Sequence, residues 1–191
     1  MKIGLYFGSF NPVHIGHMAI ANYILEFSEI NKLWFVVSPQ NPLKKKASLL
    51  AEHHRYELLN LAITDISKYK VCTVEFSMPK PSYTIDTLIY LSEKYPDNIF
   101  YLIMGADNLA NIKKWKNYDI ILNDYKILVY PRPGFDNLEL LSHKNVKIVN
   151  APLIEISSSF IRKSIKQKID VSNFMPCKVA EYVKEMHFYE K

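Results

Sequence analysis

The chain has 191 residues, of which 49% are hydrophobic and 23% charged, and its formal net charge is +5 at pH 7. This length and apolar content predict one domain, residues 1–191, and no apolar run is long enough to cross a membrane. The start of the chain lacks the residue order of a signal peptide, and the two cysteines lie outside any C-x-x-C pattern, so we expect a cytoplasmic protein with free thiols. The basic charge suits a polyanionic ligand, but no RNA-binding aromatic signature or long arginine-rich segment predicts a nucleic-acid partner.

Strand and helix patterns alternate along the chain. Short apolar runs predict strands at residues 3–7, 33–38, 71–76, 99–104, 126–130 and 146–149. Helical spacing predicts helices from about residue 16, over 49–66 and 84–95, in one or two short pieces within 106–122, and from about 158 and 176. This order predicts an α/β, doubly wound (Rossmann-like) parallel sheet of about five to six strands with helices on both faces. A ligand is then expected at the carboxyl ends of the strands.

The turn after the first predicted strand carries two histidines. Residues 8–17 read Gly-Ser-Phe-Asn-Pro-Val-His-Ile-Gly-His, so His14 and His17 flank the predicted start of a helix. A helix N-terminus offers unpaired N–H groups and the positive end of the helix dipole, and imidazoles add further donors for phosphate oxygens. The alternative is a pair of surface or capping histidines. The position at the first strand-to-helix turn favours a phosphate site.

Other strand ends carry matching chemistry. Lys44 leaves the second strand and can neutralise a phosphate as a point charge, whereas Lys45 and Lys46 fit a solvated run. Asp107 follows the fourth strand, where a carboxylate suits a ribose diol; the less favoured alternative is that Asp107 is an N-cap. Three further polar or aromatic features belong to this group: Ser82-Tyr83-Thr84-Ile85-Asp86-Thr87, Trp115, and Ile156-Ser157-Ser158-Ser159-Phe160-Ile161-Arg162. In the first of them, Ser82 or Thr84 could instead simply cap a helix.

These motifs, in this order, resemble those of the nucleotidyltransferases that carry the H-x-G-H motif. The chain as a whole is similar to the bacterial nicotinate-nucleotide adenylyltransferases, a family of NAD-biosynthesis enzymes. The resemblance spans nearly all of the chain. It departs from the family's usual pattern at five positions: Ser9 replaces a glycine or threonine, Asn11 an aspartate, Leu43 a histidine, Lys116 an aromatic residue and Ser159 a threonine.

The resemblance implies transfer of AMP from ATP to nicotinate mononucleotide, which yields deamido-NAD and pyrophosphate, with Mg²⁺ accompanying ATP and no metal ligands supplied by the protein. It implies catalytic roles for His14, His17 and Arg162. It assigns ATP binding to Gly8, Ser9, Phe10, Gly16, Gly105, Asp107, Ile156, Ser157 and Ser158. It assigns acceptor binding to Lys44, Arg55, Tyr83, Thr84, Trp115 and Arg132, although a surface or interhelical ion pair is an equal alternative for Arg55. Assembly into a homo-oligomer stays open.

Several related activities compete with this interpretation. A dual nicotinate and nicotinamide mononucleotide adenylyltransferase would share every motif. Pantetheine-phosphate adenylyltransferases share the first and the serine motifs, but they are shorter and lack the Tyr-Thr-x-Asp-Thr and tryptophan elements. Class I aminoacyl-tRNA synthetases need tRNA-binding domains for which this chain has no room. A non-catalytic nucleotide sensor on the same fold is the alternative outside enzymes, and the presence of both histidines and Arg162 counts against it.

Overall fold

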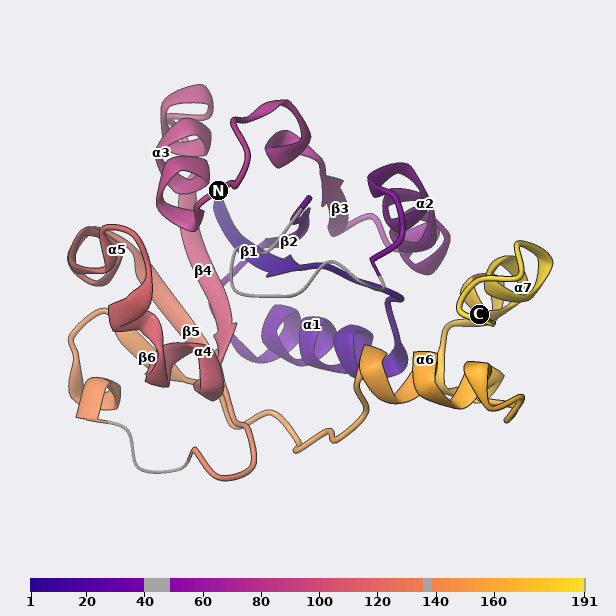
Figure 1. Cartoon of the computed structure of the whole chain (residues 1–191). Coiled ribbons are helices and arrows are strands. Elements are labelled where there is room, and N and C mark those ends of the chain that lie inside the picture. Colours follow the sequence, from indigo (N-terminus) through magenta and orange to yellow (C-terminus); the bar gives the residue numbers. More distant parts are fainter. Residues whose placement is uncertain (40–48, 136–138, 191) are drawn as a thin grey trace.

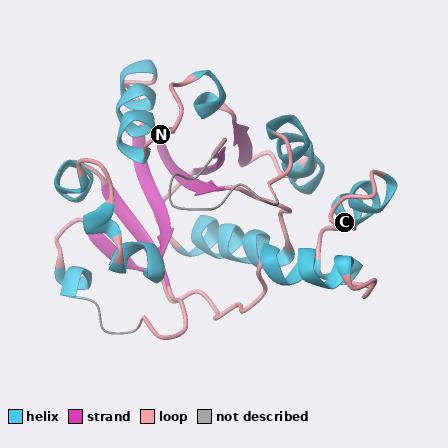
Figure 2. Cartoon of the chain, viewed as in Figure 1, coloured by secondary structure: helices cyan, strands magenta, loops and turns pink. Residues whose placement is uncertain are grey.

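The computed structural model describes residues 1–39, 49–135 and 139–190. Strands and helices alternate along the chain, as Figures 1 and 2 show. The strands are β1 (Lys2–Gly8), β2 (Lys32–Val37), β3 (Tyr69–Cys72), β4 (Ile99–Gly105), β5 (Lys126–Tyr130) and β6 (Val146–Ile148). The α-helices are α1 (Ile15–Phe27), α2 (Glu52–Ile63), α3 (Thr84–Lys94), α4 (Ala106–Ala110), α5 (Tyr118–Asp124), α6 (Ser158–Lys166) and α7 (Cys177–Glu185). Short 3-10 turns lie at Val74–Ser77, Ile112–Lys114, Glu139–Ser142 and Ser172–Phe174.

The six strands form one parallel sheet in the order β3-β2-β1-β4-β5-β6, which confirms the predicted fold class. The chain winds outward from β1 in one direction and then from β4 in the other, so the strand order reverses between these two strands. In doubly wound folds this reversal opens a crevice at the carboxyl ends of the strands. The site is therefore expected beyond Gly8 and Gly105, where β1 and β4 end.

Alternate strand residues feed two separate hydrophobic layers. On one face, Tyr6, Phe35 and Tyr101 pack with apolar residues of α1, α2, α6 and α7. On the other, Leu5 and Leu102 pack with apolar residues of α3, α4 and α5. Burial on both faces explains why the strands read as continuous apolar runs in the sequence. Among the described residues, no helix is long and apolar enough to span a bilayer.

The third strand differs from the prediction. It covers Tyr69–Cys72, and residues 74–76, which the apolar run placed in the strand, lie in the 3-10 turn Val74–Ser77 instead. The turn carries Glu75 into the interior, where its side chain is 2% exposed. The local sequence resembles a strand because it is apolar on both sides of the glutamate. The residues that hydrogen-bond to this glutamate lie further along the chain, so the local pattern does not reveal them.

Candidate functional site

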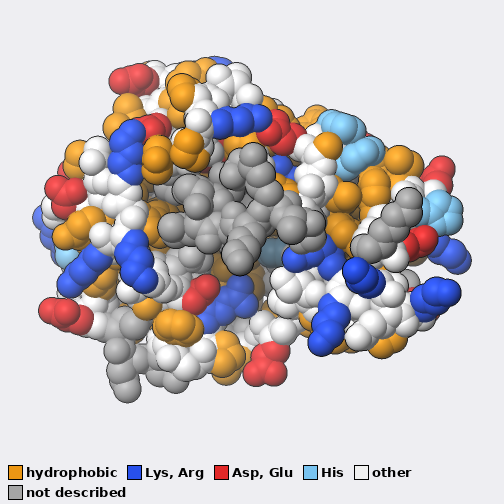
Figure 3. All heavy atoms as spheres, in the orientation of Figure 1, with side chains coloured by type: hydrophobic (Ala, Val, Ile, Leu, Met, Phe, Trp, Pro, Cys, Tyr) orange, Lys and Arg blue, Asp and Glu red, His pale blue; other side chains and the backbone are white. Residues whose placement is uncertain are grey.

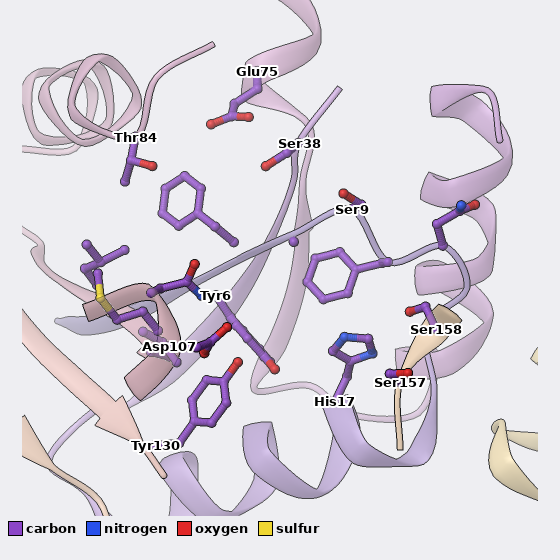
Figure 4. Close-up of a pocket in the computed structure, with 18 of the residues that line it drawn as sticks. Tyr6, Ser9, His17, Ser38, Glu75, Thr84, Asp107, Tyr130, Ser157 and Ser158 are labelled. Atoms are coloured by element: carbon purple, nitrogen blue, oxygen red, sulfur yellow. The ribbon is translucent and has the colours of Figure 1, made fainter. Parts of the chain in front are cut away.

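A cavity of about 680 Å³ opens where β1, β4 and β5 end. It is lined by the β1–α1 turn, the N-terminal turns of α3 and α6, and the segments that follow β4 and β5. Figure 4 shows His17, Ser157 and Ser158 at one side of it, Asp107, Tyr6 and Tyr130 at another, and Thr84, Glu75 and Ser38 at a third. The strand ends thus bring together motifs that are up to 150 residues apart in the sequence.

The β1–α1 turn is held by a buried aromatic ring. Phe10 adopts a positive φ of 46° and is 2% exposed. Its ring makes edge contacts with Tyr6, Phe35 and His17 at centroid distances of 5.8, 5.6 and 5.1 Å. A Cβ on Gly8 would lie 2.8 Å from this ring, so a side chain there would displace it. Phe10 therefore shapes the turn through packing, and any contact with a nucleotide falls to its main chain.

The two histidines stack at the start of α1, with ring centroids 3.7 Å apart. The main-chain N–H of His14 donates to Nδ1 of His17 at 3.2 Å, so neutral His17 carries its proton on Nε2. His17 is half-buried and lines the cavity, whereas His14 is 5% exposed. Burial, reinforced by the positive charge of Arg132, lowers the pKa of His14 to about 4. At neutral pH, His14 is thus an uncharged donor or acceptor next to His17.

The N-terminus of α6 is docked onto the β1–α1 turn. Ser157 caps the helix by accepting from the Phe160 N–H at 3.1 Å, and Ser158 donates its hydroxyl to the Pro12 carbonyl at 2.8 Å. The Arg162 guanidinium donates to the Asn11 carbonyl at 2.7 Å and to the Ser159 hydroxyl at 3.2 Å. Two helix N-termini, of α1 and α6, therefore face the same cavity, as the sequence predicts for a triphosphate site.

Asp107 and Arg132 lie together at the ends of β4 and β5. The Asp107 Oδ1 atom is 3.7 Å from Nε of Arg132, and both atoms are buried without a hydrogen bond. The N-cap of α4 is Gly105, so the capping alternative for Asp107 is wrong. A Cβ at Gly105 would lie 2.3 Å from that carboxylate oxygen, so the glycine makes room for Asp107. Both residues line the cavity and keep other side-chain atoms exposed, which a ligand can reach.

The opposite end of the cavity is formed by α3 and the segment after α4. Thr84 begins α3, and Tyr83 occupies the N-cap without a side-chain bond, so the prediction that Ser82 or Thr84 caps this helix is wrong. Trp115 is half-buried and lines the cavity beside Tyr83 and Lys116. The Lys116 ammonium pairs with Asp86 at 2.9 Å and lies 4.9 Å from the Tyr83 ring centre. Aromatic rings, helix N–H groups and one cation converge here.

Arg55 does not contact this cavity. Its side chain is fully buried and donates to the main-chain carbonyls of Leu50, Ser9, Ser38 and Pro39 at 2.7 to 3.0 Å. Four of its five N–H donors bond to main-chain carbonyls, and among the described residues Arg55 neither lines this cavity nor forms an ion pair, which argues against both the predicted acceptor contact and the ion-pair alternative.

Gly16 and Gly105, two of the predicted ATP-binding residues, are not among the described residues that line the cavity. Gly16 faces the His14 ring and Ile154, where a Cβ would have contacts of 3.0 Å, so it serves close packing. Lys44 lies outside the described residues. Apart from Arg55, the remaining predicted residues line the cavity: His14, His17, Arg162, Gly8, Ser9, Phe10, Asp107, Ile156, Ser157, Ser158, Tyr83, Thr84, Trp115 and Arg132.

Cationic side chains are also frequent next to the site. Figure 3 shows lysine and arginine side chains gathered over the region of α6. Lys163 and Lys166 lie in the last turn of that helix, and Arg162 reaches the cavity itself. This potential would attract a polyanion toward the two helix N-termini.

Sequence reasoning missed Glu75 and Tyr189. Glu75 lines the cavity, and Tyr189, near the C-terminus, donates its hydroxyl to Oδ1 of Asn11 at 2.8 Å. Neither belongs to a recognisable motif. The only signal in the sequence was the glutamate itself, placed within an otherwise apolar run.

Comparisons with known proteins agree with this geometry. A family model described as cytidylyltransferase-like matches residues 5–164. The Flavobacterium johnsoniae protein named a probable nicotinate-nucleotide adenylyltransferase is 49% identical over 193 residues, covering 100% of both chains. The protein of the same name from Bacteroides thetaiotaomicron is 45% identical and covers 97% of this chain and 92% of its own.

Solved structures share the fold. Plasmodium falciparum nicotinic acid mononucleotide adenylyltransferase complexed with NaAD has a TM-score of 0.85 at 24% identity, with 99% of this chain and 97% of that chain covered. The same enzyme complexed with APC has a TM-score of 0.82 at 23% identity, covering the same shares. Because the family model spans most of the chain and the curated relatives match it from end to end, this chain belongs to the nicotinate-nucleotide adenylyltransferases of the cytidylyltransferase-like family.

Proposed function

We propose that this protein transfers the adenylyl group of ATP to nicotinate mononucleotide. An oxygen of the acceptor phosphate attacks the α-phosphorus of ATP in line, the bond from that phosphorus to the β-phosphate oxygen breaks, and deamido-NAD and pyrophosphate leave. The acceptor phosphate is already a nucleophile at neutral pH, so no general base is needed. Catalysis then rests on positioning and on electrostatic stabilisation.

The observation that carries the proposal is a single cavity with two chemically different ends. The N-termini of α1 and α6, with His17 and Arg162, suit the triphosphate and the charge that develops during transfer. Asp107 would accept from ribose hydroxyls. His14 would contribute a neutral donor beside His17, because the pKa of His14 is lowered to about 4.

At the other end, Trp115 and Tyr83 would hold the pyridine ring, and main-chain N–H groups near Thr84 would read its carboxylate. The Lys116 ammonium at this end is paired with Asp86, so the preference for an acid over an amide is assigned to the main-chain donors.

Mg²⁺ would accompany ATP and neutralise part of the phosphate charge. No group of three His, Cys, Asp or Glu residues in the described part of the chain could hold a metal ion. The donor set at the triphosphate end consists of hydroxyls, imidazoles and a guanidinium, which suits phosphate oxygens better than a cation. The ion would therefore be bound by phosphate oxygens and water.

The test is pyrophosphate release with ATP and four acceptors: nicotinate mononucleotide, nicotinamide mononucleotide, phosphopantetheine and glycerol phosphate. We expect nicotinate mononucleotide to have a kcat/KM roughly ten- to a hundredfold above that of the amide, because an amide NH₂ would face a main-chain donor and leave it unpaired. Equal values for the two mononucleotides would indicate a dual-specificity enzyme. Turnover with phosphopantetheine alone would overturn the proposal, and absence of turnover with all four would favour a nucleotide sensor.

A further inference from the structure

Glu75 is a buried carboxylate that the reaction as described does not use. It lies in the 3-10 turn Val74–Ser77 directly after β3 and is 2% exposed. Its Oε2 accepts from the Ser82 hydroxyl at 2.8 Å, and its Oε1 accepts from the Thr87 hydroxyl at 2.8 Å. Figure 4 shows Glu75 at the wall of the cavity, near Ser38 at the end of β2 and across from Thr84.

The two hydroxyl donors bracket the acceptor end of the cavity. Ser82 precedes Tyr83 and Thr84, and Thr87 follows them by one helical turn. Both donor side chains are buried, Ser82 at 8% exposure and Thr87 at 0%. The carboxylate therefore fixes the segment before α3 and the first turn of α3 to the same point. The backbone between them has little freedom left. It includes Tyr83 and Thr84, which line the cavity, and the first N–H groups of α3, which have no partner within the helix.

No lysine or arginine of the described residues forms an ion pair with this carboxylate; the nearby lysines pair with other acids, Lys80 with Glu52 and Lys116 with Asp86. Burial raises the pKa of Glu75, while hydrogen bonds from Thr87, Ser82 and Ser38 oppose that shift. Burying a carboxylate with hydroxyl donors but no paired cation carries a desolvation penalty that lowers the stability of the fold, so a residue that served packing alone would not need to be charged. Leucine of similar length would fill the same space without that desolvation penalty.

We propose that Glu75 is a positioning residue for the acceptor substrate, which it serves by holding Tyr83, Thr84 and the first N–H groups of α3 in the geometry that binds the acceptor's ring and acid group. This inference rests on the proposed function for the identity of the acceptor. ATP binding does not depend on Glu75, because the triphosphate end is built from the β1–α1 turn and α6, and Glu75 bonds to neither.

The experiment compares Glu75→Leu, Glu75→Gln and the control Glu29→Gln by steady-state kinetics in both substrates. Glu29 is an exposed glutamate that pairs with Lys2 at the start of β1, at the opposite end of the strands from the cavity. Glu75→Leu removes both acceptors and should raise the KM for the acceptor on the order of tenfold or more, with the KM for ATP within about twofold of the unmodified protein. Glu75→Gln keeps one acceptor oxygen and the side-chain length, so it should restore most of the acceptor affinity. Glu29→Gln should change neither KM.

The acceptor in these assays is the one that the unmodified protein prefers among the four tested above. A wrong acceptor identity would therefore appear in the unmodified protein, whereas a wrong role for Glu75 would appear only in the variants. Should Glu75→Leu fail to fold, Ser82→Ala removes a single donor and should still raise the acceptor KM severalfold without changing the ATP KM. Unchanged kinetics in folded variants, or equal increases in both KM values, would refute the proposal and leave Glu75 a structural residue.

Discussion

Replacing Arg55 by methionine should destabilise the protein strongly, although Arg55 touches no ligand. The guanidinium makes four hydrogen bonds, of 3.0, 2.9, 2.7 and 3.0 Å, to main-chain carbonyls at the ends of β1 and β2 and before α2. Each hydrogen bond from a charged group contributes about 1.5–3 kcal/mol. Removing the charge also relieves its desolvation penalty, several kcal/mol, so we expect a net loss of about 3–5 kcal/mol.

For a domain of this size, such a loss lowers the melting temperature by on the order of 10 °C. Turnover should fall as well, because Ser9 and Ser38 line the cavity and share this one anchor. The assay is thermal unfolding, with urea unfolding as a second measure. The matched control is Lys68→Met, which removes an exposed 3.1 Å ion pair with Glu26 and should lose less than about 1 kcal/mol. If both variants melt at the same temperature, the Arg55 bonds do not stabilise the fold as argued.

Three further predictions concern the cavity. His17→Ala should lower kcat on the order of a hundredfold in a folded protein, because it removes a donor aimed at developing charge; near-normal turnover would exclude that role. Arg162→Lys keeps the charge but cannot bond the Asn11 carbonyl and the Ser159 hydroxyl with one planar fork, so ATP affinity or turnover should fall, and unchanged ATP kinetics would make Arg162 a purely structural link. His14 has a folded pKa of about 4 against 6.5 when unfolded, so its neutral form stabilises the fold above pH 6.5 and this contribution is lost as the pH falls toward 4. Unfolding at pH 7.5 and pH 5.0 should therefore show that His14→Gln loses about 2 kcal/mol less than the unmodified protein on acidification; equal losses would contradict the buried neutral state.

The sequence was sufficient for the fold because both faces of the sheet are buried. Strands such as 99–105 and 126–130 then read as uninterrupted apolar runs, and the helices between them keep their apolar spacing. The prediction failed at residues 74–76, where the same apolar character belongs to a 3-10 turn. Local pattern cannot distinguish the two, since the choice is made by the Ser82 and Thr87 hydroxyls that satisfy Glu75.

The motifs of the site were predictable for a different reason. Parallel strands end at one edge, so residues that follow different strands meet there whatever their distance in the sequence. What each residue does with its donors was not predictable. Arg55 and Arg162 were both predicted to contact substrates, yet Arg55 has no exposure and bonds to main-chain carbonyls, whereas Arg162 lines the cavity. That difference depends on the tertiary path of the β1–α1 turn, which no local pattern specifies.

The β1–α1 turn is fixed by contacts that come almost entirely from elsewhere in the chain. Arg55 bonds to the Ser9 carbonyl, Arg162 to the Asn11 carbonyl, and Tyr189 to the Asn11 side chain. The Asn11 amide oxygen also accepts from the Leu50 N–H at 3.2 Å, and the residue is 4% exposed. An aspartate would offer the same oxygen but would bring a charge into this buried place, and the neutral amide avoids that desolvation penalty. Because α2, α6 and the C-terminal segment all brace the turn, its donors are oriented before a ligand arrives. Such preorganisation is what transfer without a general base requires, since the rate then depends on groups that need no rearrangement when charge develops.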